Sequence, residues 1–582
     1  MRASILMLAC ILLEIPCQAR TIAVDDNGPA DFDNIQAAIN DANDGDIIEV
    51  NIGTYTGEGN RDIDFLGKGI VVRSINPDNP SIVAKTIIDC HGTEEEEHRG
   101  FYFHSGEDQN SILEGFTITN GFHGNGGGIR CEGSSPIIRK NVITGNETED
   151  DGDGGGGIAC WYGASPVITN NIISRNTCPP GGGGGGIRCY DTGSPTIADN
   201  IIFGNTASQG GGMLIDGGEP MVSGCIVRGN SCPGQGGGIL NSGGSRAILT
   251  DCTFSGNSAS YGAGVYNSEN DVTVLDCRFT GNSAEYTGGG VYSSRESSLT
   301  LVNCIFSGNG AGEHGGGMYS HGYAGTVRVR VANCTFTGNR APDGNALACD
   351  SYLQGYPSEV HVSNCILYDG GNEVWNNDGS AITISYSNIE GGEPWCYAPC
   401  DMIEWGPGNI DVDPCFVEAG KWVDANDPNT VVEANDPNAV WVDGDYHLKS
   451  EGWRLDTKFD PPRWGYDYVT SRCIDAGNPG SPLDGELLTI PDNPPHDWGK
   501  NLRINMGAYG GTAEASMPPY DWVLLADITN DGIVDARDFA HQASDWLIND
   551  TEQPGDFDRN GIVDTNDVGL LVDDWLKTTS WY

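Results

Sequence analysis

Two acidic loops near the C-terminus carry the residue pattern of a calcium site. Residues 527–538 read DITNDGIVDARD and residues 556–567 read DFDRNGIVDTND. Each loop has oxygen-bearing side chains at positions 1, 3, 5, 9 and 12, and a glycine at position 6 lets it turn back on the ion. Position 7 should supply its backbone carbonyl and bury its side chain. The predicted calcium ligands are Asp527, Thr529, Asp531, Ile533, Asp535 and Asp538 in the first loop, and Asp556, Asp558, Asn560, Ile562, Asp564 and Asp567 in the second.

An amphipathic helix is expected after each loop, over residues 539–547 and 568–576, and each ends in Asp-Trp-Leu. This duplication resembles a type I dockerin, a module of two EF-hand-like units. The resemblance implies Ca²⁺ as cofactor and a cohesin-like or cell-surface protein as partner. Thr529 departs from the usual Asn or Asp at position 3, and the residues after position 9 differ between the repeats. Folding of the unit onto its own chain is therefore the alternative.

A second set of candidate residues lies in short strands that each follow a glycine cluster. These strands read GGGIRCE from Gly126, GGGIACW from Gly155 and GGGIRCY from Gly184. Side chains alternate along a strand, so the residues between the buried Ile and Cys positions should face outward. Aromatic rings beside guanidinium groups suit a sugar chain, although aromatic residues are common on exposed sheets for conformational reasons alone. The predicted sugar-binding residues are Arg130, Trp161, Arg188 and Tyr190, and an outward column of Tyr266, Tyr292 and Tyr319 should follow them.

Catalytic residues are not evident. Glycoside hydrolysis needs two carboxyl groups at a defined separation, and no pair facing the same way over successive repeats stands out. Polysaccharide β-elimination needs a strong base, yet Lys140 is the only lysine between Lys85 and Lys421. The catalytic residues therefore remain unassigned, and whether the chain is an enzyme remains open.

The elements that must position these residues form a repeat. Over residues 115–372, apolar strands end in asparagines that recur every 25–30 residues. The segments between glycines are too short for helices and alternate apolar with polar residues. A period of this length with several short strands predicts a solenoid whose coils stack to build one core. The strand-end residues are Asn146, Asn176, Asn205, Asn230, Asn257, Asn282, Asn309 and Asn339.

Stacking makes a second prediction, that like residues lie over like residues. The residue five positions before each strand-end asparagine is an asparagine in the first three coils and a cysteine in the coils that follow. Thiols in such a column pack as small buried groups, so we expect them to be free. Cys396 and Cys400 are the predicted disulfide, with Cys415 as a rival partner. The columns are Asn141, Asn171, Asn200, Cys225, Cys252, Cys277, Cys304, Cys334 and Cys365, and separately Cys131, Cys160 and Cys189.

These repeats resemble the right-handed parallel β-helix, or pectate-lyase-like, superfamily over about residues 21–515. They also resemble the repeats of polymorphic outer-membrane proteins and their autotransporter relatives. The predicted fold class is all-β, a right-handed parallel β-helix solenoid with a small α-helical EF-hand-like dockerin domain at the C-terminus. The predicted parts are a signal peptide (1–19), an N-terminal cap and first coils (20–92), the repeat region (93–392), C-terminal coils and cap (393–517) and the calcium-binding unit (521–582).

Charge and export signals limit the partners. The chain has 30 Lys and Arg against 81 Asp and Glu, a formal charge of −51, which argues against nucleic acid and anionic lipid as partners. The apolar part of residues 1–19 is too short to span a membrane, so the expected location is secreted or at the cell surface. Polysaccharide is the expected partner. Two functions remain open: a carbohydrate-associated protein, acting as a polysaccharide lyase or O-glycosyl hydrolase if catalytic, or a non-enzymatic, adhesin-like surface scaffold.

Overall fold

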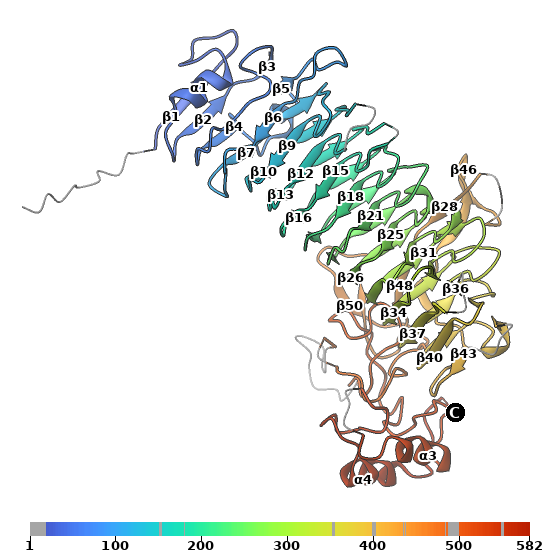
Figure 1. Ribbon diagram of the computed structural model, residues 1–582. Coiled ribbons are helices and arrows are strands. Elements are labelled where there is room, and N and C mark those ends of the chain that lie inside the picture. Colours follow the sequence, from blue (N-terminus) through green and yellow to red (C-terminus); the bar gives the residue numbers. More distant parts are fainter. Residues whose placement is uncertain are drawn as a thin grey trace, which may run out of the picture.

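The computed structural model describes residues 19–581, apart from 150–153, 180, 352–354, 399–402, 435, 437, 484, 487–499 and 549–551. Three long parallel sheets wind around one core and give an elongated solenoid, with the C-terminal helices at its far end (Figure 1). The all-β solenoid is therefore confirmed. Residues 1–18 of the predicted signal peptide, and Cys400 of the predicted disulfide, lie outside the described residues. Cys396 and Cys415 are both free thiols.

From β6 to β41, each coil gives one strand to each sheet, in the order sheet C, sheet A, sheet B. Sheet A contains β1 (Thr21–Val24), β2 (Ile47–Val50), β4 (Val71–Ser74), β7 (Ile112–Glu114), β10 (Ile137–Arg139), β13 (Val167–Thr169), β16 (Thr196–Ala198), β19 (Met221–Ser223), β22 (Ile248–Thr250), β26 (Asp271–Leu275), β30 (Ser298–Val302), β34 (Val327–Ala332), β37 (Ser358–Ser363), β40 (Ala381–Ser385) and β43 (Ile403–Trp405). Sheet B contains β3 (Gly53–Thr56), β5 (Thr86–Asp89), β8 (Thr117–Thr119), β11 (Val142–Thr144), β14 (Ile172–Ser174), β17 (Ile201–Phe203), β20 (Ile226–Arg228), β23 (Thr253–Ser255), β27 (Arg278–Thr280), β31 (Ile305–Ser307), β35 (Thr335–Thr337), β38 (Ile366–Tyr368) and β41 (Asn388–Ile389). Sheet C contains β6 (Phe101–Phe103), β9 (Ile129–Glu132), β12 (Ile158–Trp161), β15 (Ile187–Tyr190), β18 (Met213–Asp216), β21 (Ile239–Ser242), β25 (Val265–Ser268), β29 (Val291–Ser294), β33 (Met318–Gly322), β36 (Leu347–Ser351), β39 (Val374–Asn376) and β42 (Cys396–Tyr397).

The asparagine ladder forms as the spacing predicts. Asn146 Nδ2 donates to Asn176 Oδ1 at 3.0 Å and to the Ile118 carbonyl at 3.1 Å. Because each amide satisfies backbone groups of the adjacent coil, the ladder closes the corner between sheet B and the glycine loop without burying an unpaired polar group. The same side-chain bond continues from Asn176 through Asn205, Asn230, Asn257, Asn282 and Asn309 to Asn339.

The ladder ends on a partly buried acid. Asp369 stands where another asparagine would continue the column, and its Oδ1 accepts the Asn339 side-chain amide at 2.9 Å. Glu373 is fully buried beside it, and its Oε1 accepts the Asp369 backbone N–H at 3.0 Å. The other two oxygens, Asp369 Oδ2 and Glu373 Oε2, are buried without a hydrogen-bond partner among the described residues. Burial, and for Glu373 also the nearby Asp369 charge, raises the pKa of both carboxyl groups.

The cysteine columns are also confirmed. Cys131 pairs in register with Cys160, and Cys160 with Cys189. All the cysteines of both columns are buried free thiols. Burial, together with hydrogen bonding between neighbouring thiols, raises the pKa of Cys334 well above its ordinary value. These thiols therefore act as core packing groups with little thiolate character.

Each end of the solenoid is covered. Helix α1 (Ile35–Asp41) packs Ile35 and Ile39 onto the first coil, and α2 (Pro80–Val83) follows. After the short helix η1 (Glu393–Trp395) and β43, the chain runs back along the outside of the coils (Figure 1). The returning strands are β44 (Phe416–Glu418), β45 (Lys421–Asp424), β46 (Asp427–Val431), β47 (Ala439–Val442), β48 (Asp445–Leu448), β49 (Arg454–Asp456) and β50 (Arg463–Gly465). Three further strands, β24 (Ser258–Tyr261), β28 (Ser283–Thr287) and β32 (Gly310–Ala311), line the glycine loops.

Helices α3 (Ala536–Ser544) and α4 (Thr565–Asp574) form the C-terminal unit, residues 521–581. Both begin three residues earlier than the sequence predicts. The reason is capping: Asp535 and Asp564, at loop position 9, accept a backbone N–H of the following first turn and start each helix there. None of the helices in the described part of the chain is long and apolar enough to cross a membrane.

Candidate functional site

The structure brings the four predicted sugar-binding residues together on the outer face of sheet C. Tyr190 pairs in register with Trp161, and their rings lie 4.7 Å apart. The Arg188 guanidinium lies 5.5 Å from the Trp161 ring and 5.6 Å from the Tyr190 ring. Arg130 lies two coils from Arg188 in the same column. It forms an ion pair with Glu132 at 2.9 Å. The stacking prediction therefore places these residues correctly.

The expected exposure of this surface is wrong. Trp161 is only 4% exposed, and the column of Tyr266, Tyr292 and Tyr319 is buried at 4–7% exposure. For the tyrosine column, the physical reason is the glycine cluster before each strand. A side chain at Gly262 would lie 2.9 Å from Cβ of Tyr266, so the glycine loop folds directly over the outward residue. The glycines therefore make a second, outer packing layer, and Tyr190 remains the most exposed of the four residues.

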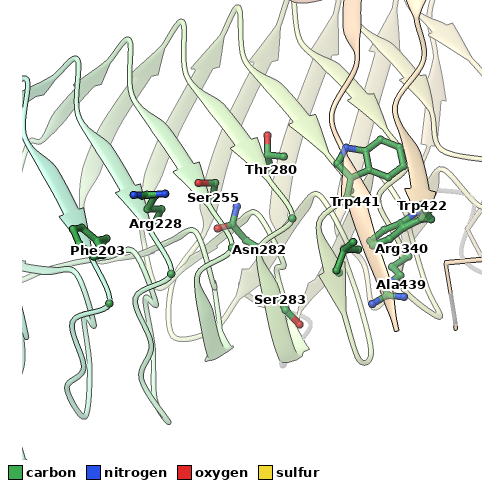
Figure 2. A pocket seen from close by; sticks show the side chains of 17 residues that line it. Phe203, Arg228, Ser255, Thr280, Asn282, Ser283, Arg340, Trp422, Ala439 and Trp441 are labelled. Atoms are coloured by element: carbon green, nitrogen blue, oxygen red, sulfur yellow. The ribbon is translucent and has the colours of Figure 1, made fainter. Parts of the chain in front are cut away.

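A groove on the outer face of sheet B is a site that the sequence reasoning missed. It has a volume of about 850 Å³ and lies where the strands β45 to β47 cross the solenoid (Figure 2). Its floor is a column of glycines, because the residue after each sheet-B strand is Gly204, Gly229, Gly256 and Gly281 in four successive coils. These coils span about 14 Å at the spacing of paired strands.

Aromatic residues close one end of this groove. Trp441 lies so close to the next two glycines, Gly308 and Gly338, that a Cβ on either would lie 2.1 Å from its ring. Trp422 packs edge-on against Trp441, and the Arg340 guanidinium lies 4.6 Å from the Trp422 ring (Figure 2). At the other end, Arg175 replaces the glycine of the preceding coil and borders Gly204.

The charge of the groove is opposite to that of the chain. Above the glycine floor, Phe203, Arg228, Ser255 and Thr280 form one column of outward side chains on successive strands (Figure 2). Arg228 lies 5.2 Å from the Phe203 ring. The described residues that line the groove include Arg228 and Arg340 and contain no Asp or Glu. In a chain of formal charge −51, this surface can receive a negatively charged ligand.

The second acidic loop gathers carboxylates around one point. Ligand atoms of Asp556, Asp558 and Asp567 lie within 4.8 Å of one another. The Asp556 carboxylate also accepts the N–H of Gly561, whose φ of 92° requires glycine. Oxygen ligands that converge in this way suit Ca²⁺. Asn560 and Asp564 lie on the same loop, and Asp564 also caps α4.

The first loop differs from the second because an arginine side chain within it pairs with the loop carboxylates. Asp527 and Asp538 are buried, and Thr529 Oγ1 donates to Asp538 at 3.1 Å. The Arg537 guanidinium forms ion pairs with Asp531 at 2.5 Å and with Asp535 at 3.0 Å. The second loop has Asn566 at the position of Arg537. Burial raises the pKa of Asp527 to about 6, and the Asp538 charge adds to this rise.

The expected burial at loop position 7 is wrong for one residue. Ile562 is 37% exposed and Ile533 is half-buried, whereas Val534 and Val563, one position later, are fully buried. The buried position therefore comes one residue later than expected.

Both loops attach the C-terminal unit to the closing segment, residues 473–517. Asn530 and Arg559 occupy position 4 of the two loops. Asn530 Nδ2 donates to the carbonyls of Gly408 and Ala476 at 2.8 and 2.7 Å. Arg559 donates to the carbonyls of Pro479 and Ser481, each at 3.1 Å, and to that of Leu502 at 2.6 Å. The buried Arg503 guanidinium donates to the Asp527 carbonyl at 2.7 Å.

Comparisons with known proteins bear on the solenoid. A family model described as "Right handed beta helix region" matches residues 74–249 and 247–417. Among solved structures, the pectate lyase Pel9A is similar with a TM-score of 0.30 and 13% identity, over 84% of this chain and 96% of that chain. A rhamnogalacturonan lyase is similar with a TM-score of 0.24 and 10% identity, over 72% and 97%. A search of curated proteins gave no match.

Proposed function

The chain belongs to the right-handed β-helix family, and from this premise we propose that it is an exported protein that binds an acidic polysaccharide in the groove over sheet B. The observation that carries the proposal is the groove itself: a floor of glycines, aromatic walls and two arginines without an acid. A sugar ring presents an apolar face that can lie on Trp422, while its hydroxyls can bond to Ser255 and Thr280. The arginines pair with carboxylate or sulfate groups along the chain.

We further propose that the C-terminal unit is a dockerin-like module that binds two Ca²⁺ ions. The ligands would be Asp527, Thr529, Asp531, Asp535, Asp538 and the Ile533 carbonyl in one loop, and Asp556, Asp558, Asn560, Asp564, Asp567 and the Ile562 carbonyl in the other. When bound, each ion neutralises the carboxylates of its loop and holds the loop turned. The contacts of Asn530 and Arg559 favour attachment to the chain's own closing segment. The outer faces of α3 and α4 remain for a cohesin-like or cell-surface partner.

Binding to a panel of uronic-acid, sulfated and neutral polysaccharides tests the groove. Trp422→Ala should weaken binding of acidic glycans by about tenfold, because it removes roughly 1–2 kcal/mol of apolar contact. Arg228→Ala should weaken acidic glycans more than neutral ones. Arg246→Ala is the matched control, since Arg246 is exposed and pairs with Glu219 on the solenoid surface outside the groove. Equal binding by the wild type and all three variants would exclude the groove.

A further inference from the structure

The closing segment buries three polar side chains, those of Asp475, Glu486 and Asn501, in one place. Their exposed fractions are 1%, 5% and 2%. Asp475 and Glu486 are both bonded to Asn505, whose Oδ1 accepts the Asp475 N–H at 2.8 Å and whose own N–H donates to Glu486 Oε1 at 2.8 Å. Asp475 Oδ2 accepts the N–H of Leu502, the residue after Asn501, at 3.2 Å. Two buried carboxyl groups and a buried amide therefore meet around Asn505.

The backbone satisfies only one oxygen of each carboxyl group. Glu486 Oε1 accepts a second N–H, from Gly511 at 2.9 Å. The other oxygens, Asp475 Oδ1 and Glu486 Oε2, are buried and have no hydrogen-bond partner among the described residues, and the same holds for Oδ1 and Nδ2 of Asn501. Buried polar atoms are normally paired, so four unpaired atoms on three neighbouring side chains point to a ligand.

A buried acid elsewhere in the chain shows that such a group can be satisfied without a ligand. Glu107 is 2% exposed. Its Oε1 accepts the N–H of Gly67 at 2.8 Å, and its Oε2 accepts the N–H of Ser105 and the hydroxyl of Ser134, each at 2.9 Å. The two carboxyl groups of the closing segment differ from Glu107 because each keeps one oxygen unpaired.

Two arginines lie near this cluster but do not pair with it. The Arg503 guanidinium donates to the Asp527 carbonyl at 2.7 Å, and the Arg559 guanidinium donates to three other carbonyls. Neither forms an ion pair with Asp475 or Glu486 within the described part of the chain. Burial raises the pKa of Glu486 to about 7, and burial together with the Glu486 charge raises the pKa of Asp475. The two carboxyl groups therefore lack a cation of the chain that compensates their charge.

We infer that Asp475 Oδ1, Glu486 Oε2 and Asn501 Oδ1 bind a buried Ca²⁺ ion, separate from the two C-terminal loops. Carboxylate and amide oxygens are the ligands that Ca²⁺ takes in proteins, and its charge neutralises both acids. A water molecule could bond to the same atoms, but it would leave two buried charges uncompensated. A proton shared directly by the two carboxyl groups requires a hydrogen bond between them, and the described residues contain none.

This ion joins stretches of the closing segment that hold the coils on one side and the C-terminal unit on the other. The N–H groups of Asn478 and Gly507 donate to Oδ1 and to the carbonyl of Asn364 in the coils, each at 2.8 Å. Arg559 of the C-terminal unit donates to the Leu502 carbonyl at 2.6 Å. The ion therefore stabilises the contact between the solenoid and the unit that follows it.

Burial also sets how the ion exchanges. The three ligand side chains are at most 5% exposed, whereas Asp558 and Asn560 of the second loop are exposed. The buried ion must therefore enter as the closing segment folds, and it leaves only when that segment opens. Calcium added to the folded protein fills the two loops alone, so a titration counts two ions although the chain holds a third.

The test measures total calcium in the full-length protein, produced with calcium, before and after dialysis against EGTA. We expect three ions per chain before dialysis and one after it. The double variant Asp531→Ala/Asn560→Ala, which leaves the buried site intact, should keep the one retained ion. Asp475→Asn and Glu486→Gln should each lose it. Glu107→Gln is the matched control, because it changes a buried acid whose oxygens are all paired, and it should retain the ion.

The outcomes separate this site from the proposed calcium module. Two ions before dialysis and none after it would overturn the inference and leave the module intact. A retained ion in folded Asp475→Asn and Glu486→Gln would also overturn it. One retained ion in a wild type whose loops bind none would support the inference and remove the module. If Asp475→Asn and Glu486→Gln fail to fold, the double variant decides: loss of its ion on dialysis would overturn the inference.

Discussion

The repeat region and the returning C-terminal third follow different rules. In the coils, each residue meets its counterpart about one period away, as Cys131 meets Cys160. In the returning chain, the decisive contacts join residues far apart in sequence, such as Arg278 with Asp443 and Asn333 with Gly510. The proposed glycan groove lies where these two parts touch. The coils therefore supply a regular surface, and the returning chain turns selected stretches of it into cavities.

Removing one side chain of the asparagine ladder should have the largest effect on the free energy of unfolding. Asn257 Oδ1 accepts the Asn230 side-chain amide at 3.1 Å, and its Nδ2 donates to Val227 and Asn282 at 2.9 Å. Asn257→Ala leaves these buried groups unpaired, so we expect a loss of roughly 3–5 kcal/mol in unfolding free energy. Chemical denaturation would measure it. The exposed Asn429 is the control, and its alanine variant should match the wild type.

Trp161→Ala tests how much packing on the outer face of sheet C contributes to stability. The ring is 4% exposed and stacks on Tyr190, so its removal should cost about 2–4 kcal/mol of stability. Tyr190→Ala, at a side chain that is 36% exposed, should cost less. A thermal scan in which Trp161→Ala and the wild type have the same melting temperature would show that this packing adds no stability.

Calcium should stabilise the returning part of the chain and leave the coils unchanged. Ions at one hundred times their dissociation constant would add about 2.7 kcal/mol per site. We expect calorimetry to count two ions, and Asp531→Ala and Asn560→Ala each to remove one. Arg537→Ala should strengthen binding at the first loop, because it frees Asp531 and Asp535 from their ion pairs. No calcium-dependent heat in the wild type would end the proposal.

The smallest expected effect is a pH dependence of stability that comes from Asp369, the acid at the end of the asparagine ladder. Because burial raises the folded-state pKa of Asp369, the folded chain binds more protons than the unfolded chain above an ordinary aspartate pKa of about 3.9. The contribution of Asp369 to stability should therefore fall as pH rises from about 4 toward neutrality, by roughly 1–2 kcal/mol. Asp369→Asn should extend the ladder and flatten this slope. An unchanged slope would show that the Asp369–Glu373 pair does not titrate in this range.

The sequence predicts the coils well because their order is local and periodic. The stacked positions of Tyr266, Tyr292 and Tyr319 follow from the repeat alone, but their burial does not, because it depends on how the glycine loop folds back. The glycines of the groove floor are visible in the repeat as the residue before each strand-end asparagine. Trp441, which closes the groove, lies more than 100 residues from them, and nothing in a single sequence relates the two.

The covered ends of the solenoid have a further consequence. The last strands of each sheet, β41, β42 and β43, present backbone donors and acceptors that could pair with the first strands of another molecule. The C-terminal unit and the closing segment stand over this end and hold it through Asn530 and Arg559. At the other end, α1 lies against β1 and β2. Because both ends are capped, a fold that could grow indefinitely by adding coils is limited to one chain, and the molecule avoids end-to-end fibre growth.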